Sequence, residues 1–495
     1  MAEYLIQDTT MTDMANQMRR LSGRTDTLSG AEIVELFTKT TGDLNYNGDY
    51  RAKIYDSTCL NQYDNNSSGD VIKSRLYNTG EICAMPIPPT KDGMTFQGWS
   101  CSSPLKSDSY VVVENSPIRA GTIYTPNDDV FVIKVEITEP NTYVHFNFNN
   151  RYSIDWGDGA VTVDEYAYHT YEEIGTYTIQ IFNKVTMTYY DDSTGYRGNI
   201  SNNGNVIKEV LIPPYITDIN KSFFDECSSL EVVSLHGKIT TIRSDAFSYS
   251  GLKHIVIPDS VTELGMGIFF NCKNLKSIVL PYGLTELPSY TFYGCSSLTE
   301  DDIVLPKSIS SIGNLAFAYC TGLTNIPALP DGITEISSGM FYECKNLTSA
   351  IIPDNITKIN DKAFAGCKQL SEAVIPDGVT SIEAYGFASE EFINSIDNIT
   401  LQTLIIPSSV VYLGEKVFNG RKLKNLVLLA EQVCESDGDM FGESGCSNNM
   451  PPSYGYNDFY NIYVPDSLVS AYKADSYWGK FSSTIKPISQ YTNAG

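Results

Sequence analysis

The sequence is short of basic residues. Of its 495 residues, 34 are lysine or arginine and 59 are aspartate or glutamate, so the formal net charge at pH 7 is −25. A surface of this sign repels phosphate backbones and anionic lipid headgroups. We therefore expect no nucleic-acid partner and no attachment to an anionic membrane surface.

Long hydrophobic runs are also missing. No stretch approaches the roughly 18 consecutive apolar residues of a transmembrane helix, so we expect no membrane insertion. The opening, MAEYLIQDTTMTDMANQMRR, lacks the basic-then-apolar layout of a secretory signal. From this opening we expect a protein that is not exported by that route. It could still reach the outside of cells as part of a particle released by lysis.

Motifs of catalytic chemistry are absent. No G-x-S-x-G, H-E-x-x-H, P-loop or G-x-G-x-x-G stands in a fitting context, and adjacent acids such as Asp301 and Asp302 would point to opposite faces of a strand. The one enzymatic alternative is a carboxylate pair brought together by folding, as in glycosidases. We expect a non-enzyme, and assign no catalytic, cofactor-binding or metal-ligating residue.

The cysteines are 11 in number and do not form a disulfide pattern, because they are odd in count and spread along the chain. They also lack the CxxC pairs of zinc sites. Six recur at one position of an internal repeat: Cys227, Cys272, Cys295, Cys320, Cys344 and Cys367. We interpret them as small apolar side chains of a core.

The C-terminal part of the sequence is dominated by a repeat of about 23 residues. Its template is L-x-x-I-x-I-P-x-x-(V/I)-T-x-I followed by F-x-x-C, as in LKHIVIPDSVTELGMGIFFNC from Leu252. Roughly ten copies run from about Val206 to Phe441. Stacked copies can bury together what one copy cannot bury alone. A buried ladder is expected of Phe224, Phe247, Phe269, Phe292, Phe317, Phe341, Phe364, Phe387 and Phe418.

These repeats resemble the BspA-like leucine-rich repeats, a family found in bacterial surface adhesins and in some phage and protist proteins. The resemblance covers about half of the chain and rests on the I-P-x-x-V-T-x-I and F-x-x-C elements. The closing segment, NIYVPDSLVSAYKADSYWGKFSSTIKPI, is similar to the usual end of such arrays, which implies a last strand and a capping helix. The resemblance implies adhesion or protein–protein binding, although a fold by itself argues function only weakly.

One outward strand position of the repeat is β-branched almost throughout. These residues are Val256, Val279, Val304, Ile351, Val374, Ile405 and Val427, and polar residues such as Lys253 and Ser349 flank them. An apolar stripe with a polar rim is typical of a ligand-binding or self-association face. Two alternatives remain open: these residue types simply suit a strand, or a neighbouring segment covers the stripe.

The first residues, 1–44, predict a short strand followed by two helices. The segment YLIQDTTMTDMANQMRRLSGRTD resembles one that opens many phage tail and minor structural proteins, although Leu21-Ser22 departs from the more usual Lys-Thr. The resemblance implies that residues 1–44 bind other virion or tail proteins.

Residues 45–137 predict a β-rich domain, because they contain short alternating runs such as SYVVVEN and VFVIKVEI. Within it, PIPPTKDGMTFQGWS resembles a hairpin of the β-grasp repeats of internalin-type surface proteins, the alternative being a generic glycine-turned hairpin. The sequence does not settle whether this region is one domain or two.

Residues 138–200 contain W-G-D-G at Trp156–Gly159, then His169-Thr170-Tyr171 and GTYTI, which resemble the PKD-type immunoglobulin-like sandwich. The resemblance implies a tight W-G-D-G turn with H-x-Y packed beside it, and a linker follows. Asp155 and Asp158 could ligate Ca²⁺, but that ion needs about six oxygen ligands. We favour a structural role for both in the turn.

The sequence thus predicts a mainly β, multidomain protein: a helical attachment segment (1–44), a β-rich domain (45–137), a PKD-like sandwich plus linker (138–200) and a BspA-like leucine-rich-repeat solenoid with a C-terminal cap (201–495). We expect a homo-oligomeric phage tail or virion protein, structural or receptor-binding, located on the particle surface. Its solenoid would bind a host surface protein or glycan. The alternatives are a bacterial cell-surface BspA-like adhesin and, less favoured, a tail enzyme that degrades envelope polysaccharide.

Overall fold

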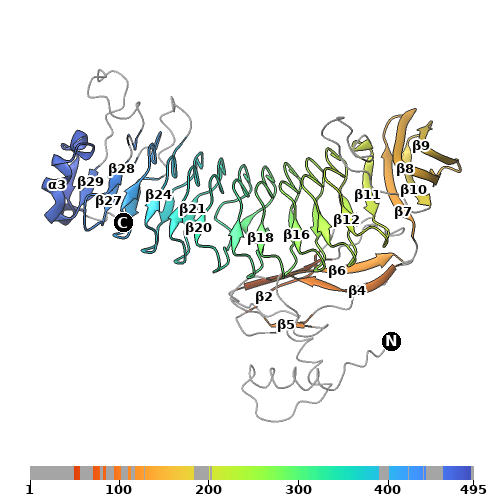
Figure 1. The fold of residues 1–495 in the computed structure, drawn as a ribbon, viewed down its shortest axis with the longest axis horizontal. Helices are drawn as coiled ribbons and strands as arrows, with labels where there is room; N and C mark the ends of the chain where they lie inside the picture. Colours follow the sequence, from red (N-terminus) through yellow and green to blue (C-terminus); the bar gives the residue numbers. More distant parts are fainter. Residues whose placement is uncertain are drawn as a thin grey trace, which may run out of the picture.

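The computed structural model is mainly β, with a long solenoid of stacked coils and a short helix near its C-terminal end (Figure 1). The structure describes the strands between residues 50 and 126, and then residues 129–182, 200, 203–389, 401–421, 423–436, 438, 440–441 and 461–491. The predicted mainly β fold with its C-terminal solenoid is confirmed. The helical segment expected at residues 1–44 lies outside the described residues.

Most coils contribute two short strands, whereas only one strand per repeat is expected from the sequence. The I-x-I-P part of the repeat forms β11 (Ile207–Leu211), β13 (Val232–Ser234), β15 (His254–Val256), β17 (Ser277–Val279), β21 (Ser349–Ile351), β23 (Glu372–Val374), β25 (Thr403–Ile406), β27 (Asn425–Leu428) and β29 (Asn461–Val464). The T-x-I part forms β12 (Asp218–Ile219), β14 (Thr241–Ile242), β16 (Glu263–Leu264), β18 (Glu286–Leu287), β19 (Ser311–Ile312), β20 (Glu335–Ile336), β22 (Lys358–Ile359), β24 (Ser381–Ile382), β26 (Tyr412–Leu413) and β28 (Glu435–Ser436). In the first of the two coils between β17 and β21, a 3-10 turn, η2 (Glu300–Asp302), precedes the I-x-I-P position.

Strands of neighbouring coils pair in parallel and in the register of the repeat. Val256 lies opposite Val279, and Ile351 lies opposite Val374. Each position of the template therefore becomes a straight column of side chains that runs along the solenoid.

The predicted phenylalanine ladder is present in the core. Consecutive rings from Phe224 to Phe387 stack with centroids 5.2–5.9 Å apart and planes within 5–19° of parallel. Phe418 is buried as well and contacts Phe441 at 5.8 Å. Offset stacks of this kind add to the free energy gained by burial of the rings.

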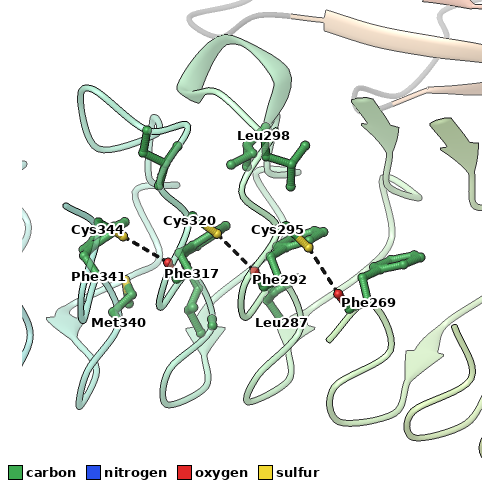
Figure 2. Close-up of a cluster of buried hydrophobic side chains, with 14 of the residues drawn as sticks. Phe269, Leu287, Phe292, Cys295, Leu298, Phe317, Cys320, Met340, Phe341 and Cys344 are labelled. Atoms are coloured by element: carbon green, nitrogen blue, oxygen red, sulfur yellow. Dashed lines mark hydrogen bonds between the residues drawn. The ribbon is translucent and has the colours of Figure 1, made fainter. Parts of the chain in front are cut away.

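The cysteine column is buried beside the phenylalanine ladder, as expected, and its thiols also act as hydrogen-bond donors. The Sγ of Cys295 donates to the carbonyl oxygen of Phe269 at 3.1 Å, and Cys320 donates to Phe292 at 3.0 Å (Figure 2). Burial raises the pKa of Cys320 to about 12, so its thiol stays protonated at neutral pH. Five thiols of the column each satisfy the carbonyl of a phenylalanine in the preceding coil: Cys272, Cys295, Cys320, Cys344 and Cys367.

The turn around each ladder phenylalanine uses left-handed backbone. Residues two before and two after Phe317, namely Leu315 and Tyr319, have φ angles of 57° and 59°. This conformation strains residues with a Cβ, and other coils place glycine there, as at Gly294 (φ 73°). The hydrogen bond from Phe317 N to Met340 O (3.0 Å), in the next coil, helps to hold the turn.

The N-terminal end of the solenoid is closed by a sheet of six strands. Their order is β13-β11-β7-β10-β8-β9, in which β7 is Phe131–Ile137, β8 is Thr142–Asp155, β9 is Val161–Tyr171 and β10 is Gly175–Phe182. Strand β7 pairs antiparallel with β11, so that Ile133 lies opposite Val210. The inward side chains of β7, including Phe131 and Val135, join the core of the first coils.

This sheet differs from the predicted arrangement of residues 138–200. The sequence predicts a separate PKD-like sandwich followed by a linker, whereas the described strands of this region lie in one sheet that continues into the solenoid. Strand β7, which the sequence analysis placed in the domain 45–137, also belongs to this sheet. The physical reason is that the first coil has an open end, and the apolar face of β7 buries it.

The strands before β7 form a second sheet, of order β2-β1-β6-β4. They are β1 (Tyr50–Tyr55), β2 (Val71–Tyr77), β4 (Met94–Cys101) and β6 (Ile118–Pro126), while β3 (Ile82–Ala84) pairs with β5 (Tyr110–Val112). Strand β4 carries the T-F-Q-G-W part of the β-grasp-like piece, and residues 85–93 lie outside the described residues. Strand β6 contacts β15 and β17 of the solenoid, and Figure 1 shows it beneath the early coils.

The C-terminal end of the core is closed as the sequence predicts, by a last strand and a helix. After β29 come η4 (Asp466–Leu468), α3 (Val469–Ala474), η5 (Trp478–Phe481), β30 (Ile485–Pro487) and η6 (Ile488–Gln490). Tyr472 and Trp478 are buried, and the Trp478 indole donates to the Cys434 carbonyl oxygen at 3.0 Å. The aromatic cap thus covers the last coil.

Candidate binding surfaces

No metal cluster or membrane span is evident in the part of the chain that the structure describes. Within it, no group of three or more His, Cys, Asp or Glu side chains is placed to hold a metal ion. Over the same residues, no helix is long and apolar enough to cross a membrane.

The W-G-D-G turn joins β8 to β9 and packs against the H-x-Y residues as the resemblance implied. The Trp156 and His169 rings stack at 5.2 Å, and the Tyr171 hydroxyl donates to the Trp156 carbonyl oxygen at 2.7 Å. Asp155 accepts a hydrogen bond from Gly157 N at 2.9 Å. This carboxylate holds the backbone of the turn.

The second aspartate of the turn has the same kind of role. Asp158 accepts hydrogen bonds from Ala160 N at 3.0 Å and, through its other oxygen, from His169 Nε2 at 2.6 Å. Burial alone would raise the pKa of Asp158, but these two donors outweigh it and the pKa is lowered. Both carboxylates thus hold the backbone of the W-G-D-G turn.

The first part of the predicted apolar stripe is covered by the chain itself. Val256 and Val279 are buried and form a small cluster of their own, separate from the solenoid core. Strand β6 lies against the two strands that carry them. Their neighbours His254 and Ser277 are buried too, with His254 Nδ1 2.6 Å from the Ser277 hydroxyl. For these coils, the alternative that a neighbouring segment covers the stripe is the correct one.

The two remaining buried members of the stripe lie on either side of an open section. Val304, one coil after Val279, is buried. Val427 is buried as well and lies in register with Tyr463, whose ring contacts Tyr491 at 5.0 Å. The C-terminal cap therefore lies beside this end of the stripe.

Between Val304 and Val427 lies the open stripe, which consists of Ile351, Val374 and Ile405. Their side chains are 60%, 46% and 43% exposed, respectively. The adjacent outward column is mostly uncharged: Ser349 donates to the Glu372 carboxylate at 3.0 Å, and Asn425 donates to Thr403 at 3.2 Å. Three of the seven predicted stripe residues are thus available to a partner.

A second surface, which the sequence analysis missed, is formed by rings on the turn side of the coils. This aromatic ridge consists of Tyr249, Phe270, Tyr293, Tyr319 and Tyr342. Consecutive ring centroids are 5.5, 4.5, 5.0 and 5.5 Å apart. The signal in the sequence is the aromatic residue between the phenylalanine and the cysteine of F-x-x-C, as in F-Y-G-C and F-A-Y-C.

The ridge rings are partly exposed, and the hydroxyl groups of Tyr293 and Tyr319 interact. Tyr249, at one end, is 47% exposed, while the others are half-buried. Burial raises the pKa of Tyr293 to about 12, and the Tyr319 hydroxyl adds to this shift. The ridge therefore combines apolar contact area with the hydrogen-bonding hydroxyl groups of its four tyrosines.

The family comparison identifies the repeat. The model of the BspA-type leucine-rich repeat region matches residues 199–303, 300–424 and 394–452, with six copies of the model. These matches together span slightly more than half of the chain. The protein belongs to the BspA-type leucine-rich-repeat family.

Several solved structures are similar to parts of the chain. A leucine-rich cell surface protein from Faecalibacterium prausnitzii has 30% identity over 36% of this chain and 55% of its own, with a TM-score of 0.28. A leucine-rich repeat protein from Bacteroides ovatus has 19% identity over 71% of this chain and 99% of its own, with a TM-score of 0.37. The pneumococcal vaccine antigen PcpA has 19% identity over 61% and 81%, with a TM-score of 0.36. Curated proteins give no significant sequence match.

Proposed function

We propose that this protein is a non-catalytic adhesin of the bacterial cell surface, which binds a protein or glycan ligand through the outer surface of its solenoid. The observation that carries the proposal is the assignment of residues 199–452 to the BspA-type family. It favours the adhesin over the virion protein that the sequence analysis put first.

The aromatic ridge is the part of the solenoid that we assign to the ligand. Tyrosine supplies a large contact area at a low cost in side-chain entropy, and its hydroxyl group adds hydrogen bonds to protein or sugar. The ridge rings already restrain one another through contacts of 4.5–5.5 Å, so little further ordering is needed on binding. Repetition by coil gives an extended surface instead of one pocket.

Binding of the labelled full-length protein to a panel of bacterial and host cells tests this function. We expect retention on particular cells, and a loss of about tenfold or more in the Tyr293→Ser/Tyr319→Ser variant. Tyr282→Ser is the matched control, because Tyr282 is 45% exposed but does not belong to the ridge. Absence of binding to every cell type, or equal loss in the control, would contradict the assignment.

A virion role is a second candidate that rests on one observation, the resemblance of residues 1–44 to the opening segment of phage tail proteins. In that case the segment would bind other tail proteins. Mass spectrometry of purified phage particles from the source community would detect the chain if this candidate is correct. Incorporation that persists after deletion of residues 1–44 would contradict the role of the segment.

A further inference from the structure

The open stripe is the uncovered middle of a column whose early part already packs against a β-sheet. Val256 and Val279, in the same column, lie against β6 of the four-stranded sheet β2-β1-β6-β4. The chain itself thus shows one kind of occupant of this face, a strand of another β-sheet. Ile351, Val374 and Ile405 lie at the same template position with the same types of side chain, but they are 43–60% exposed.

The charge around the open stripe narrows the choice of occupant. The adjacent column holds Ser349, Glu372, Thr403 and Asn425, so a single carboxylate stands beside three rungs in a chain whose net charge is −25. A basic partner would be matched by an acidic patch, which is absent from these positions. Two acidic chains, in contrast, can approach closely only where charge is sparse.

The side chains of the stripe also argue against a glycan at this position. Sugar rings are bound by aromatic faces and by planar polar groups, whereas the open stripe consists of two isoleucines and one valine. Aliphatic β-branched columns are what packed sheets interdigitate across a spacing of about 10 Å.

We propose that the open stripe is the contact through which two copies of this chain associate face to face. Two-fold pairing places the same patch on both sides and is the commonest symmetry of soluble oligomers. Ile351, Val374 and Ile405 of one copy pack against the same column of its partner. The contact involves few rungs, so the dimer is concentration-dependent, with a dissociation constant on the order of 10 µM.

This inference is independent of the proposed function, because it concerns the strand face and not the aromatic ridge. The salt dependence of self-association distinguishes an apolar contact from one made by ion pairs. Screening reduces the repulsion between two acidic chains, so added salt strengthens an apolar self-contact. A contact made by ion pairs would respond in the opposite direction.

Sedimentation velocity of the full-length protein between about 1 and 100 µM, at low and high salt, tests the dimer. We expect a monomer–dimer equilibrium that shifts toward dimer with salt, and a loss of association of about tenfold or more in Val374→Glu. Val411→Glu is the control, because Val411 is 40% exposed but lies outside the stripe. Val374→Thr, which keeps the shape of the side chain, should weaken the dimer less.

Three outcomes would overturn the proposal. They are a monomer at all concentrations, equal weakening by Val411→Glu, or glycan binding by the monomer that Val374→Glu abolishes. Circular dichroism and thermal unfolding of each variant separate a lost contact from a lost fold. Loss of dimerisation by Val374→Glu with cell binding unchanged would leave the proposed adhesin function intact.

Discussion

The early and late coils of the solenoid carry the same outward residues but expose them very differently. Val279 is 0% exposed beneath β6 of the four-stranded sheet, whereas Val374, at the same template position, is 46% exposed. The repeat determines the direction in which a side chain points. What lies above that side chain depends on a domain that the repeat does not encode.

The largest expected difference between the two regions is the cost of a buried charge. Val279→Asp places a carboxylate under β6. It should lower the free energy of unfolding by about 3 kcal/mol or more, or detach the four-stranded sheet that contains β6 from the solenoid. Val374→Asp should change it by less than about 0.5 kcal/mol. Urea denaturation measures both, and hydrogen exchange of β6 detects detachment. Similar values for the two variants would show that β6 does not cover Val279 in solution.

A second prediction concerns the core, where the early and late coils should behave alike. The cysteine column is buried in both regions, so the difference between them should be confined to the outer face. Burial raises the pKa of Cys272 and of Cys367 from 9.0 to about 12. Below pH 9 the thiols are protonated in both the folded and the unfolded state. Between about pH 9 and 12 only the unfolded thiols ionise, so the stability of the fold should fall as the pH rises through this window.

Alkylation measured residue by residue by mass spectrometry, with urea denaturation at each pH, checks this prediction. Cys272 and Cys367 should react with iodoacetamide only as fast as the protein unfolds. Rapid labelling of Cys272 alone in the native protein would show that the core of the early coils opens on its own. Stability that stays constant up to pH 12 would contradict the raised pKa values.

The smallest expected difference concerns one hydroxyl at equivalent positions of the two regions. Ser277 contacts His254 in the section covered by β6, whereas Ser349 donates a hydrogen bond to Glu372 in the open section. Ser277→Ala should cost about 1–2 kcal/mol, because a buried polar partner is lost, and Ser349→Ala about 0.5 kcal/mol or less. Thermal unfolding of the two variants checks the order. Equal costs would place Ser277 in contact with water.

Much of the fold could be predicted from the sequence, because the solenoid depends on local periodicity. The positions of Phe292 and Cys295 were predictable, since each coil repeats the same inward pattern and stacks on its neighbour. Closure of the N-terminal end was not, because β7 pairs with β11 across more than 70 residues that include β8 and β9. A motif such as W-G-D-G indicates a local turn, but not which sheet the turn belongs to.

Prediction of the candidate surfaces was less complete for a related reason. The stripe was assigned from strand alternation, which places Val256 and Ile351 on the same face but contains no information about β6. The aromatic ridge was missed because the residues between phenylalanine and cysteine are the unassigned positions of the F-x-x-C template. Two of the ridge residues, Tyr249 and Tyr319, themselves have left-handed backbone, a conformation that strand alternation does not predict.

The parallel register also determines how this molecule could change its length. Because each residue pairs with its equivalent in the next coil, a whole coil can be added or removed without altering either end cap. An extra coil between Val304 and Val427 would lengthen the open stripe by one rung and leave the covered rungs unchanged. The length of the solenoid is therefore set by the number of coils, while the structures at its two ends stay the same.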